Sequence, residues 1–223
     1  MSTDLRCAAL IAAAGEGQRL GLGPKLFLRT ADGRSLVERL ANTARGVADE
    51  VCIAVAANDV DTVMRMLPWA RVIAGGAQRD ASYSRLLEAS TAPWLMLLDV
   101  ARPFTRAELM RRTVAAAQEA GGAAMATQSL AVPAAVIDTQ GTLIDALPAA
   151  AWRLPQTPQV FQRELLQRAL DTTAASAVQT VWEGALVAGI AMHSIEGDAD
   201  NIKITTAADW ALALALHAAE PTP

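Results

Sequence analysis

A glycine-rich stretch near the start of the chain holds the first residues that could do chemistry. Residues 10–25 read LIAAAGEGQRLGLGPK, so an apolar run passes into glycines and then supplies Arg19 and Lys25. Glycines let backbone amides approach a charged ligand closely, and two cations in such a loop favour phosphate groups. We interpret the stretch as a loop that wraps a nucleoside triphosphate; the alternative is an ordinary glycine-rich surface loop.

Two common phosphate-binding loops fit this stretch poorly. A dinucleotide fingerprint needs G-x-G-x-x-G, and Leu20 holds the third glycine position. A P-loop needs Gly-Lys followed by Ser or Thr, whereas Pro24 precedes Lys25 and Leu26 follows it. A nicotinamide-dependent oxidoreductase is therefore a distant alternative.

Further polar groups follow later apolar runs. Residues 75–82 read GGAQRDAS, which suits a base edge or a phosphate, or a plain turn capped by Asp80 or Ser82. Asp99 closes an apolar run and could hold magnesium or a sugar hydroxyl, or cap the next turn. Lys25 and Lys203 are the only lysines, and a compact ammonium suits a phosphate; the alternative is a solvated surface lysine.

These residues need a scaffold, and the apolar pattern predicts one. Nearly continuous apolar runs predict strands covered on both faces, and they begin at Arg6, Val51, Ala70 and Trp94. Residues 35–38 and 105–108 both read as capping boxes that open helices. The alternation predicts an α/β fold with a mostly parallel sheet, whose carboxyl edge is the usual place for ligands.

Residues 132–150 do not follow this alternation of strands and helices. Asp138 to Gly141 lie between two apolar stretches, which predicts a β-hairpin. Such a hairpin exposes apolar side chains unless something covers them. We expect an arm that packs on a second subunit of a homodimer; the alternative is a hairpin folded over its own domain.

Composition limits the class of protein. The chain has 223 residues, 52% hydrophobic and 19% charged, which suits a single domain over 1–223. The net charge of -4 disfavours a protein that coats nucleic acid, so we expect no nucleic-acid partner. No signal peptide or spanning segment is evident, and the 2 cysteines lie in apolar runs as buried thiols. We expect a cytoplasmic protein without a membrane partner.

Five segments together resemble one family, the 2-C-methyl-D-erythritol 4-phosphate cytidylyltransferases. They read AAAGEGQRLGLGPKLFL, GGAQRDAS, LDVARPF, QTPQVFQRELLQRA and EGDADNIKITTAADWALA, in the family's order and at about its spacings. The resemblance covers nearly the whole chain. It implies a Rossmann-like nucleotidyltransferase fold of three layers, a swapped hairpin arm, a homodimer, and Mg2+-dependent transfer of CMP from CTP to a sugar-alcohol phosphate.

The resemblance also implies roles for single residues. Those that would bind the nucleotide are Ala13, Ala14, Gly15, Gly17, Gly76, Ser82 and Asp99. Arg19 and Lys25 would stabilise charge on the phosphates, and Lys203 would hold the α-phosphate. Asp99 would also be the metal ligand, and the acceptor would meet Arg102, Thr157 and, as the nearest cation after the arm, Arg153.

The acceptor half departs from the family's usual pattern. Leu98 stands where the family has histidine, and residues 130–135, 148–151 and 179–181 lack the usual Asp-Thr, Asp-Arg and Thr-Asp-Glu. Arg102, Arg153 or Arg106 would have to substitute in the acceptor pocket. Two alternatives follow: a cytidylyltransferase for another polyol phosphate, such as a pentitol phosphate, or a degenerate paralogue that binds nucleotide or a partner and catalyses nothing.

Overall fold

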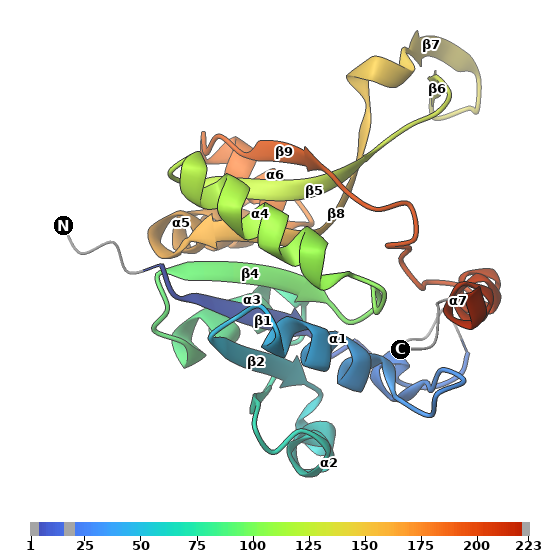
Figure 1. Cartoon of the computed structure of the whole chain (residues 1–223). Coiled ribbons are helices and arrows are strands. Elements are labelled where there is room, and N and C mark those ends of the chain that lie inside the picture. The colour runs from blue at the N-terminus through green and yellow to red at the C-terminus, as the bar shows by residue number, and fades with distance from the viewer. Residues whose placement is uncertain (1–4, 16–20, 220–223) are drawn as a thin grey trace.

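Buried strands form the centre of the molecule. The computed structural model describes residues 5–15 and 21–219. A seven-stranded sheet has the order β3-β2-β1-β4-β8-β5-β9 (Figure 1). The strands are β1 (Cys7–Ala12), β2 (Glu50–Val55), β3 (Arg71–Ala74), β4 (Trp94–Asp99), β5 (Ala123–Ser129), β8 (Arg153–Gln162) and β9 (His193–Glu196). All six residues of β4 are buried, as its unbroken apolar run predicted.

The sheet is mostly parallel, as predicted. The ladders β1–β2, β1–β4, β2–β3 and β5–β9 are parallel. Only β8, among the described strands of this sheet, runs antiparallel to its neighbours β4 and β5. The chain enters β8 from the hairpin rather than from a crossover helix, and a parallel pairing needs such a crossover.

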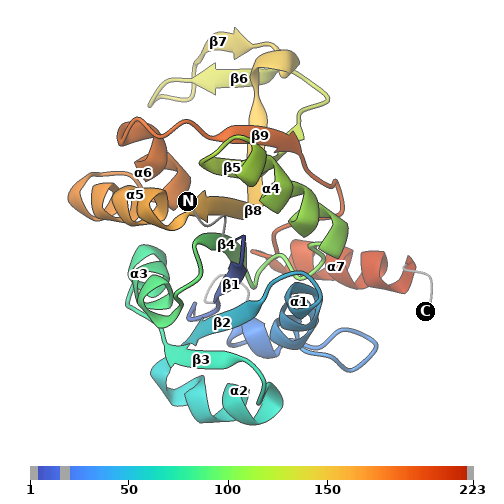
Figure 2. The ribbon, with the colours of Figure 1, turned by 60° about the vertical axis from the view of Figure 1, so that its left-hand side comes forward.

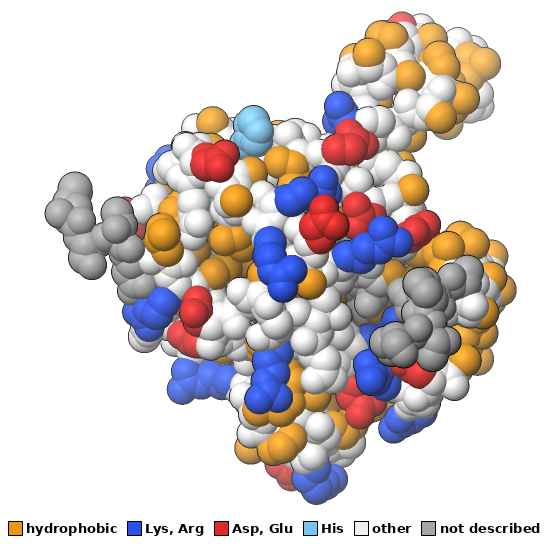
Figure 3. Space-filling model, in the orientation of Figure 1, with side chains coloured by type: hydrophobic (Ala, Val, Ile, Leu, Met, Phe, Trp, Pro, Cys, Tyr) orange, Lys and Arg blue, Asp and Glu red, His pale blue; other side chains and the backbone are white. Residues whose placement is uncertain are grey.

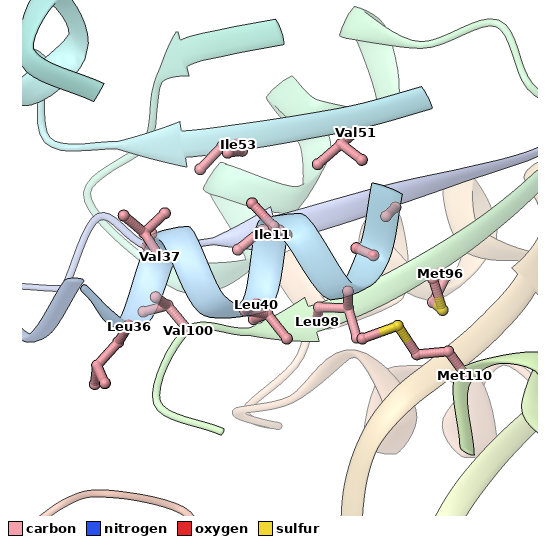
Figure 4. Close-up of a cluster of buried hydrophobic side chains, with 14 of the residues drawn as sticks. Ile11, Leu36, Val37, Leu40, Val51, Ile53, Met96, Leu98, Val100 and Met110 are labelled. Atoms are coloured by element: carbon pink, nitrogen blue, oxygen red, sulfur yellow. The ribbon is translucent and has the colours of Figure 1, made fainter. Parts of the chain in front are cut away.

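Helices cover both faces of the sheet and make three layers (Figure 2). They are α1 (Leu36–Arg45), α2 (Val60–Met66), α3 (Arg79–Ala89), α4 (Ala107–Glu119), α5 (Arg163–Ala175), α6 (Val181–Val187) and α7 (Ala207–Ala219). On one face, Leu36, Val37 and Leu40 of α1 pack against Ile11 and Ile53 (Figure 4). On the other face, α3, α5 and α6 pack against the alternate residues of the same strands. None of the described helices is long and apolar enough to cross a bilayer.

One of the two predicted capping boxes is wrong. Ser35 and Glu38 form the predicted box at the start of α1. Helix α4 instead begins after Arg106, whose side chain makes no capping bond. Because Arg106 is the N-cap, Glu108 lies at the second helical position and not at the third that a capping box needs. Oγ1 of Thr105 lies 2.9 Å from both the carbonyl of Arg102 and Oδ1 of Asn201.

The predicted hairpin is present. Strands β6 (Ala134–Ile137) and β7 (Leu143–Leu147) form a separate two-stranded antiparallel sheet that stands away from the body (Figure 1). In the turn, Oδ1 of Asp138 accepts the amides of Gln140 and Thr142, at 2.8 and 2.9 Å. Apolar side chains cover much of the arm's visible face at the upper right of Figure 3.

Candidate active site

A cavity of about 750 Å³ lies at the carboxyl edge of the sheet. Residues at or just after the ends of β1, β2, β3 and β4 line it, as do Lys25 and Lys203 from outside the sheet. Ala14, Gly15, Gly76, Ser82 and Asp99 are among the lining residues, so the structure brings these predicted residues together. The side chain of Ala13 packs in the core, and Gly17 and Arg19 lie outside the described residues.

Two glycines let the loop after β3 pack closely against the loop after β1 and against helix α3. A Cβ on Gly75 would lie 2.7 Å from Cβ of Ala14 and 2.9 Å from Oγ of Ser82. A Cβ on Gly76 would lie 2.5 Å from Cβ of Ala81. Ser82 also holds this loop, because its Oγ accepts the amide of Gly76 at 3.0 Å. The glycine-rich wall is therefore fixed by close packing.

Asp99 is the electrostatic centre of the cavity. Its Oδ2 lies 2.7 Å from Nη2 of Arg79 and 3.2 Å from Nζ of Lys203, and its Oδ1 accepts the amide of Ala101 at 3.0 Å. Burial alone would raise the pKa of this carboxyl, but Arg79 and Lys203 outweigh burial, and the pKa lies below its usual value. Asp99 is therefore ionised at neutral pH.

The segment that carries Lys203 is tied to the early part of the chain. Nζ of Lys25 donates to the carbonyl of Ile204 at 2.8 Å. The amide of Ile204 donates to the carbonyl of Ala101, also at 2.8 Å. These bonds bring both lysines of the sequence to one cavity, as their predicted roles require.

A smaller cavity of about 250 Å³ adjoins the first. Among the described residues, Arg79, Asp99 and Lys203 line both cavities. The others that line the smaller one include Tyr83, Arg102, Gln156, Thr157, Gln159, Thr180 and Trp182. Oγ1 of Thr157 is buried and has no hydrogen-bond partner among the described residues, so this hydroxyl is able to take a new partner.

A break in strand pairing turns Thr157 towards this cavity. β8 pairs with β4 from Gln162 to Gln159 and not beyond, within the described register. Its pairing with β5 then slips, so that Met125 faces Gln159 but Thr127 faces Pro155. Residues 156–158 are thereby released from the ladder beside the end of β4.

The two other predicted acceptor residues are engaged elsewhere. The Arg102 guanidinium lines the smaller cavity but donates to the carbonyl of Asn201, and to the carbonyl of Pro155 at 3.0 Å. Arg153 is not among the described residues that line either cavity; it pairs with Glu196 at the base of the arm. The cationic acceptor groups expected from the sequence are thus held by contacts within the fold.

Sequence reasoning missed three contributors. Arg79 lies inside the quoted GGAQRDAS segment, so its charge beside two glycines was an available signal. Tyr83 follows one helical turn later on α3. The buried Asn201 donates to Oε1 of Gln156 at 3.1 Å and to the carbonyl of Thr157 at 2.7 Å, and no local pattern predicts such distant pairs.

The donor set for a metal is small. The described residues contain no group of three or more His, Cys, Asp or Glu side chains that could hold a metal ion. Asp99 is the carboxylate that lines both cavities. A single carboxylate suits Mg2+ that is also bound by phosphate oxygens of a nucleotide, and it does not suit a metal cage made by protein alone.

Parallel strands that end at a glycine-walled cavity with converging cations are typical of nucleotide-binding α/β proteins. Comparison with known proteins is more specific. A sequence model of 2-C-methyl-D-erythritol 4-phosphate cytidylyltransferase matches residues 7–218. The enzyme of that name from Deinococcus radiodurans is 38% identical over 215 residues, covering 95% of this chain and 89% of its own.

Solved structures agree with the sequence comparison. The crystal structure of 2-C-methyl-D-erythritol 4-phosphate cytidylyltransferase from Thermus thermophilus aligns with a TM-score of 0.79 and 33% identity, covering 95% of this chain and 98% of that one. The 4-diphosphocytidyl-2C-methyl-D-erythritol synthase from Anaerococcus prevotii shares the fold, with a TM-score of 0.85 at 24% identity and 96% of each chain covered. The chain belongs to the 2-C-methyl-D-erythritol 4-phosphate cytidylyltransferase family, as the sequence resemblance predicted.

Proposed function

We propose that this protein transfers CMP from CTP to 2-C-methyl-D-erythritol 4-phosphate and releases pyrophosphate, a step of isoprenoid precursor biosynthesis. Its membership of a cytidylyltransferase family makes it an enzyme of the nucleotidyltransferase class. The observation that carries the proposal is the pair of cavities that meet at Arg79, Asp99 and Lys203. Two substrates bound side by side there would place donor and acceptor phosphates at one charged junction.

CTP would occupy the larger cavity. The loops around Ala14, Gly15 and Gly76 would take the cytidine, because their backbone can approach a ligand closely. Lys25 and Lys203 would face the phosphates, together with Arg19 from the segment outside the described residues. These cations match the several negative charges of a triphosphate.

The acceptor would enter through the smaller cavity, where Thr157 offers its unpartnered hydroxyl. An oxygen of the acceptor phosphate attacks the α-phosphorus, and the bond from that phosphorus to the bridging oxygen breaks. Pyrophosphate leaves with the electron pair of that bond. Little covalent chemistry falls to the protein, so Lys25 and Lys203 contribute by positioning and by stabilising charge in the transition state.

Magnesium is the proposed cofactor, and Asp99 would hold it together with the phosphates of CTP. When bound, Mg2+ neutralises phosphate charge. Both oxygens of Asp99 already have partners, Oδ2 with Arg79 and Lys203 and Oδ1 with Ala101, so Asp99 would exchange its cation contacts to serve as a ligand.

We further propose that the enzyme is a homodimer joined through the hairpin arm. The support is the exposed apolar surface of β6 and β7, which a second copy would cover. We also propose a cytoplasmic location, because CTP, the proposed donor, is a metabolite of the cell interior.

Release of pyrophosphate tests the function. The protein is incubated with CTP and Mg2+, with and without 2-C-methyl-D-erythritol 4-phosphate, and in parallel with a pentitol phosphate. We expect release that depends on 2-C-methyl-D-erythritol 4-phosphate. Release with the pentitol phosphate alone would favour the other acceptor. No release from a protein that CTP stabilises would favour the catalytically degenerate paralogue.

A further inference from the structure

The side chain of Arg79 lies where the proposed reaction must occur. It is one of three described residues that line both cavities, and the other two, Asp99 and Lys203, already have proposed roles. The bond between the α-phosphorus of a nucleotide in one cavity and an acceptor in the other must form at this junction. This inference rests on the proposed function, because it uses the assignment of the larger cavity to CTP.

The guanidinium of Arg79 has further donors available. Its one hydrogen bond among the described residues goes to Oδ2 of Asp99, and 43% of the side chain is exposed. By contrast, Arg102 donates to two backbone carbonyls. A guanidinium has five N–H groups in a planar fork that suits phosphate oxygens, so Arg79 has more of its donors left for a phosphate than Arg102 has.

The charges at the junction favour such a change of partner. Arg79 and Lys203 share a single carboxylate oxygen, so two positive charges face one negative charge. A triphosphate in the larger cavity supplies several further negative charges to the same two cations. Once Arg79 and Lys203 contact the phosphates, the carboxylate of Asp99 is free to bind a metal ion.

We propose that Arg79 is a phosphate-binding residue of this enzyme, which gives up its ion pair with Asp99 to contact the phosphates of bound CTP. The opposing possibility is that Arg79 serves only to neutralise the buried carboxylate. The two differ in what happens when Asp99 no longer carries a charge.

A double-mutant cycle on nucleotide affinity separates these possibilities. CTP binding is measured by calorimetry in EDTA without an acceptor, for the wild type, Arg79→Gln, Asp99→Asn and the double variant. We expect Arg79→Gln to weaken CTP binding by about tenfold or more in both backgrounds, since a charge-assisted hydrogen bond is lost each time. The exposed Arg65→Gln on α2, which removes the same charge away from the cavities, should leave CTP binding unchanged.

Two results would overturn the proposal. One is unchanged CTP binding by Arg79→Gln; the other is a loss that disappears in the Asp99→Asn background, which would leave Arg79 only the role of neutralising the carboxylate. Should Arg79→Gln fail to fold, Arg79→Lys retains the ion pair and must still bind CTP more weakly. A wild type that binds CTP but makes no product would contradict the proposed reaction, but it would not contradict the proposal that Arg79 binds the phosphates of CTP. A wild type that binds no CTP would contradict both.

Discussion

Two side chains one helical turn apart on α3 hold two successive residues at the end of β4. Arg79 pairs with the carboxylate of Asp99, and the Tyr83 hydroxyl donates to the carbonyl of Leu98 at 2.9 Å. Burial raises the pKa of the fully buried Tyr83 hydroxyl, so it remains a donor at any ordinary pH. Tyr83 is thus a positioning residue for Asp99, although it does not reach the larger cavity.

Replacement of Tyr83 by phenylalanine should remove that support. The carbonyl of Leu98 loses a buried donor, which costs about 1–3 kcal/mol in the free energy of unfolding. We also expect weaker CTP binding, because the carboxylate of Asp99 is less well placed. Urea unfolding and calorimetry measure the two effects, with Ser84→Ala on the same helix as the control. Equal stability and affinity in Tyr83→Phe and wild type would contradict this role.

A methyl group on Gly75 should distort the wall of the nucleotide cavity. The added Cβ would lie 2.7 Å from Cβ of Ala14, so one of the two loops must move. Overpacking of this kind costs about 1–3 kcal/mol, and about a tenfold loss of CTP affinity is expected from Gly75→Ala. The matched control is Gly46→Ala, whose new Cβ would lie 3.5 Å from its nearest neighbour, the carbonyl of Thr43. The idea fails if both variants bind CTP as the wild type does.

At the scale of elements, neighbouring strands β1 and β2 each bury one cysteine. Burial, followed by the charge of Asp49, raises the pKa of Cys7 to about 12. Burial, followed by the charge of Glu50, raises the pKa of Cys52 to about 11. Both thiols therefore stay protonated in the folded sheet at a pH where an unfolded chain has lost the proton.

The sheet should lose stability in alkaline solution for this reason. An unfolded thiol ionises near pH 8.5, so above that pH the unfolded state binds fewer protons and the free energy of unfolding falls. Each thiol contributes about 1.4 kcal/mol per pH unit until the pH passes the folded pKa, about 11 for Cys52 and about 12 for Cys7. Urea unfolding between pH 7.5 and 10 measures the slope, and the Cys7→Ala, Cys52→Ala double variant should show a flatter one. An identical slope in both proteins would exclude the thiols as its source.

Local pattern predicted the elements well and their contacts poorly. The strand that contains Leu95, Met96 and Leu97 could be predicted, because a short unbroken apolar run is typical of a buried strand. The capping box predicted at Thr105 is absent because α4 begins one residue later, with Arg106 at the N-cap, and the Thr105 hydroxyl contacts the distant Asn201. Likewise, nothing near Arg102 in the sequence shows that its guanidinium is bound to Asn201 and Pro155. Such contacts join distant segments, and only the folded chain decides which arginine can reach a ligand.

At the scale of the whole molecule, the arm exposes large apolar side chains away from the body. Leu143 is 71% exposed, Ile144 61% and Ile137 59%. The hairpin was predictable from its turn residues, and its apolar side chains led to the prediction of an arm; in the structure, β6 and β7 form a separate sheet away from the body. Its exposed side chains are the basis for the proposed dimer.

Charged residues on the arm should therefore separate the proposed dimer. Leu143→Asp with Ile144→Asp would place two carboxylates in the interface, and we expect the sedimentation coefficient to fall from that of a dimer to that of a monomer. Gln140→Glu, at the exposed turn of the same hairpin, adds a charge outside the apolar surface and should leave the sedimentation coefficient unchanged. A monomeric wild type, or a dimer that survives both aspartates, would argue against this interface.

The hydrogen bond from Lys25 to the carbonyl of Ile204 has a consequence for synthesis of the chain on the ribosome. Every strand of the seven-stranded sheet precedes Lys203, since β9 ends at Glu196. A nascent chain thus contains every strand of the sheet before it has a complete nucleotide cavity. CTP would then stabilise only chains that include Lys203, and a chain cut short before it would also lack Ile204, which is fully buried in the core.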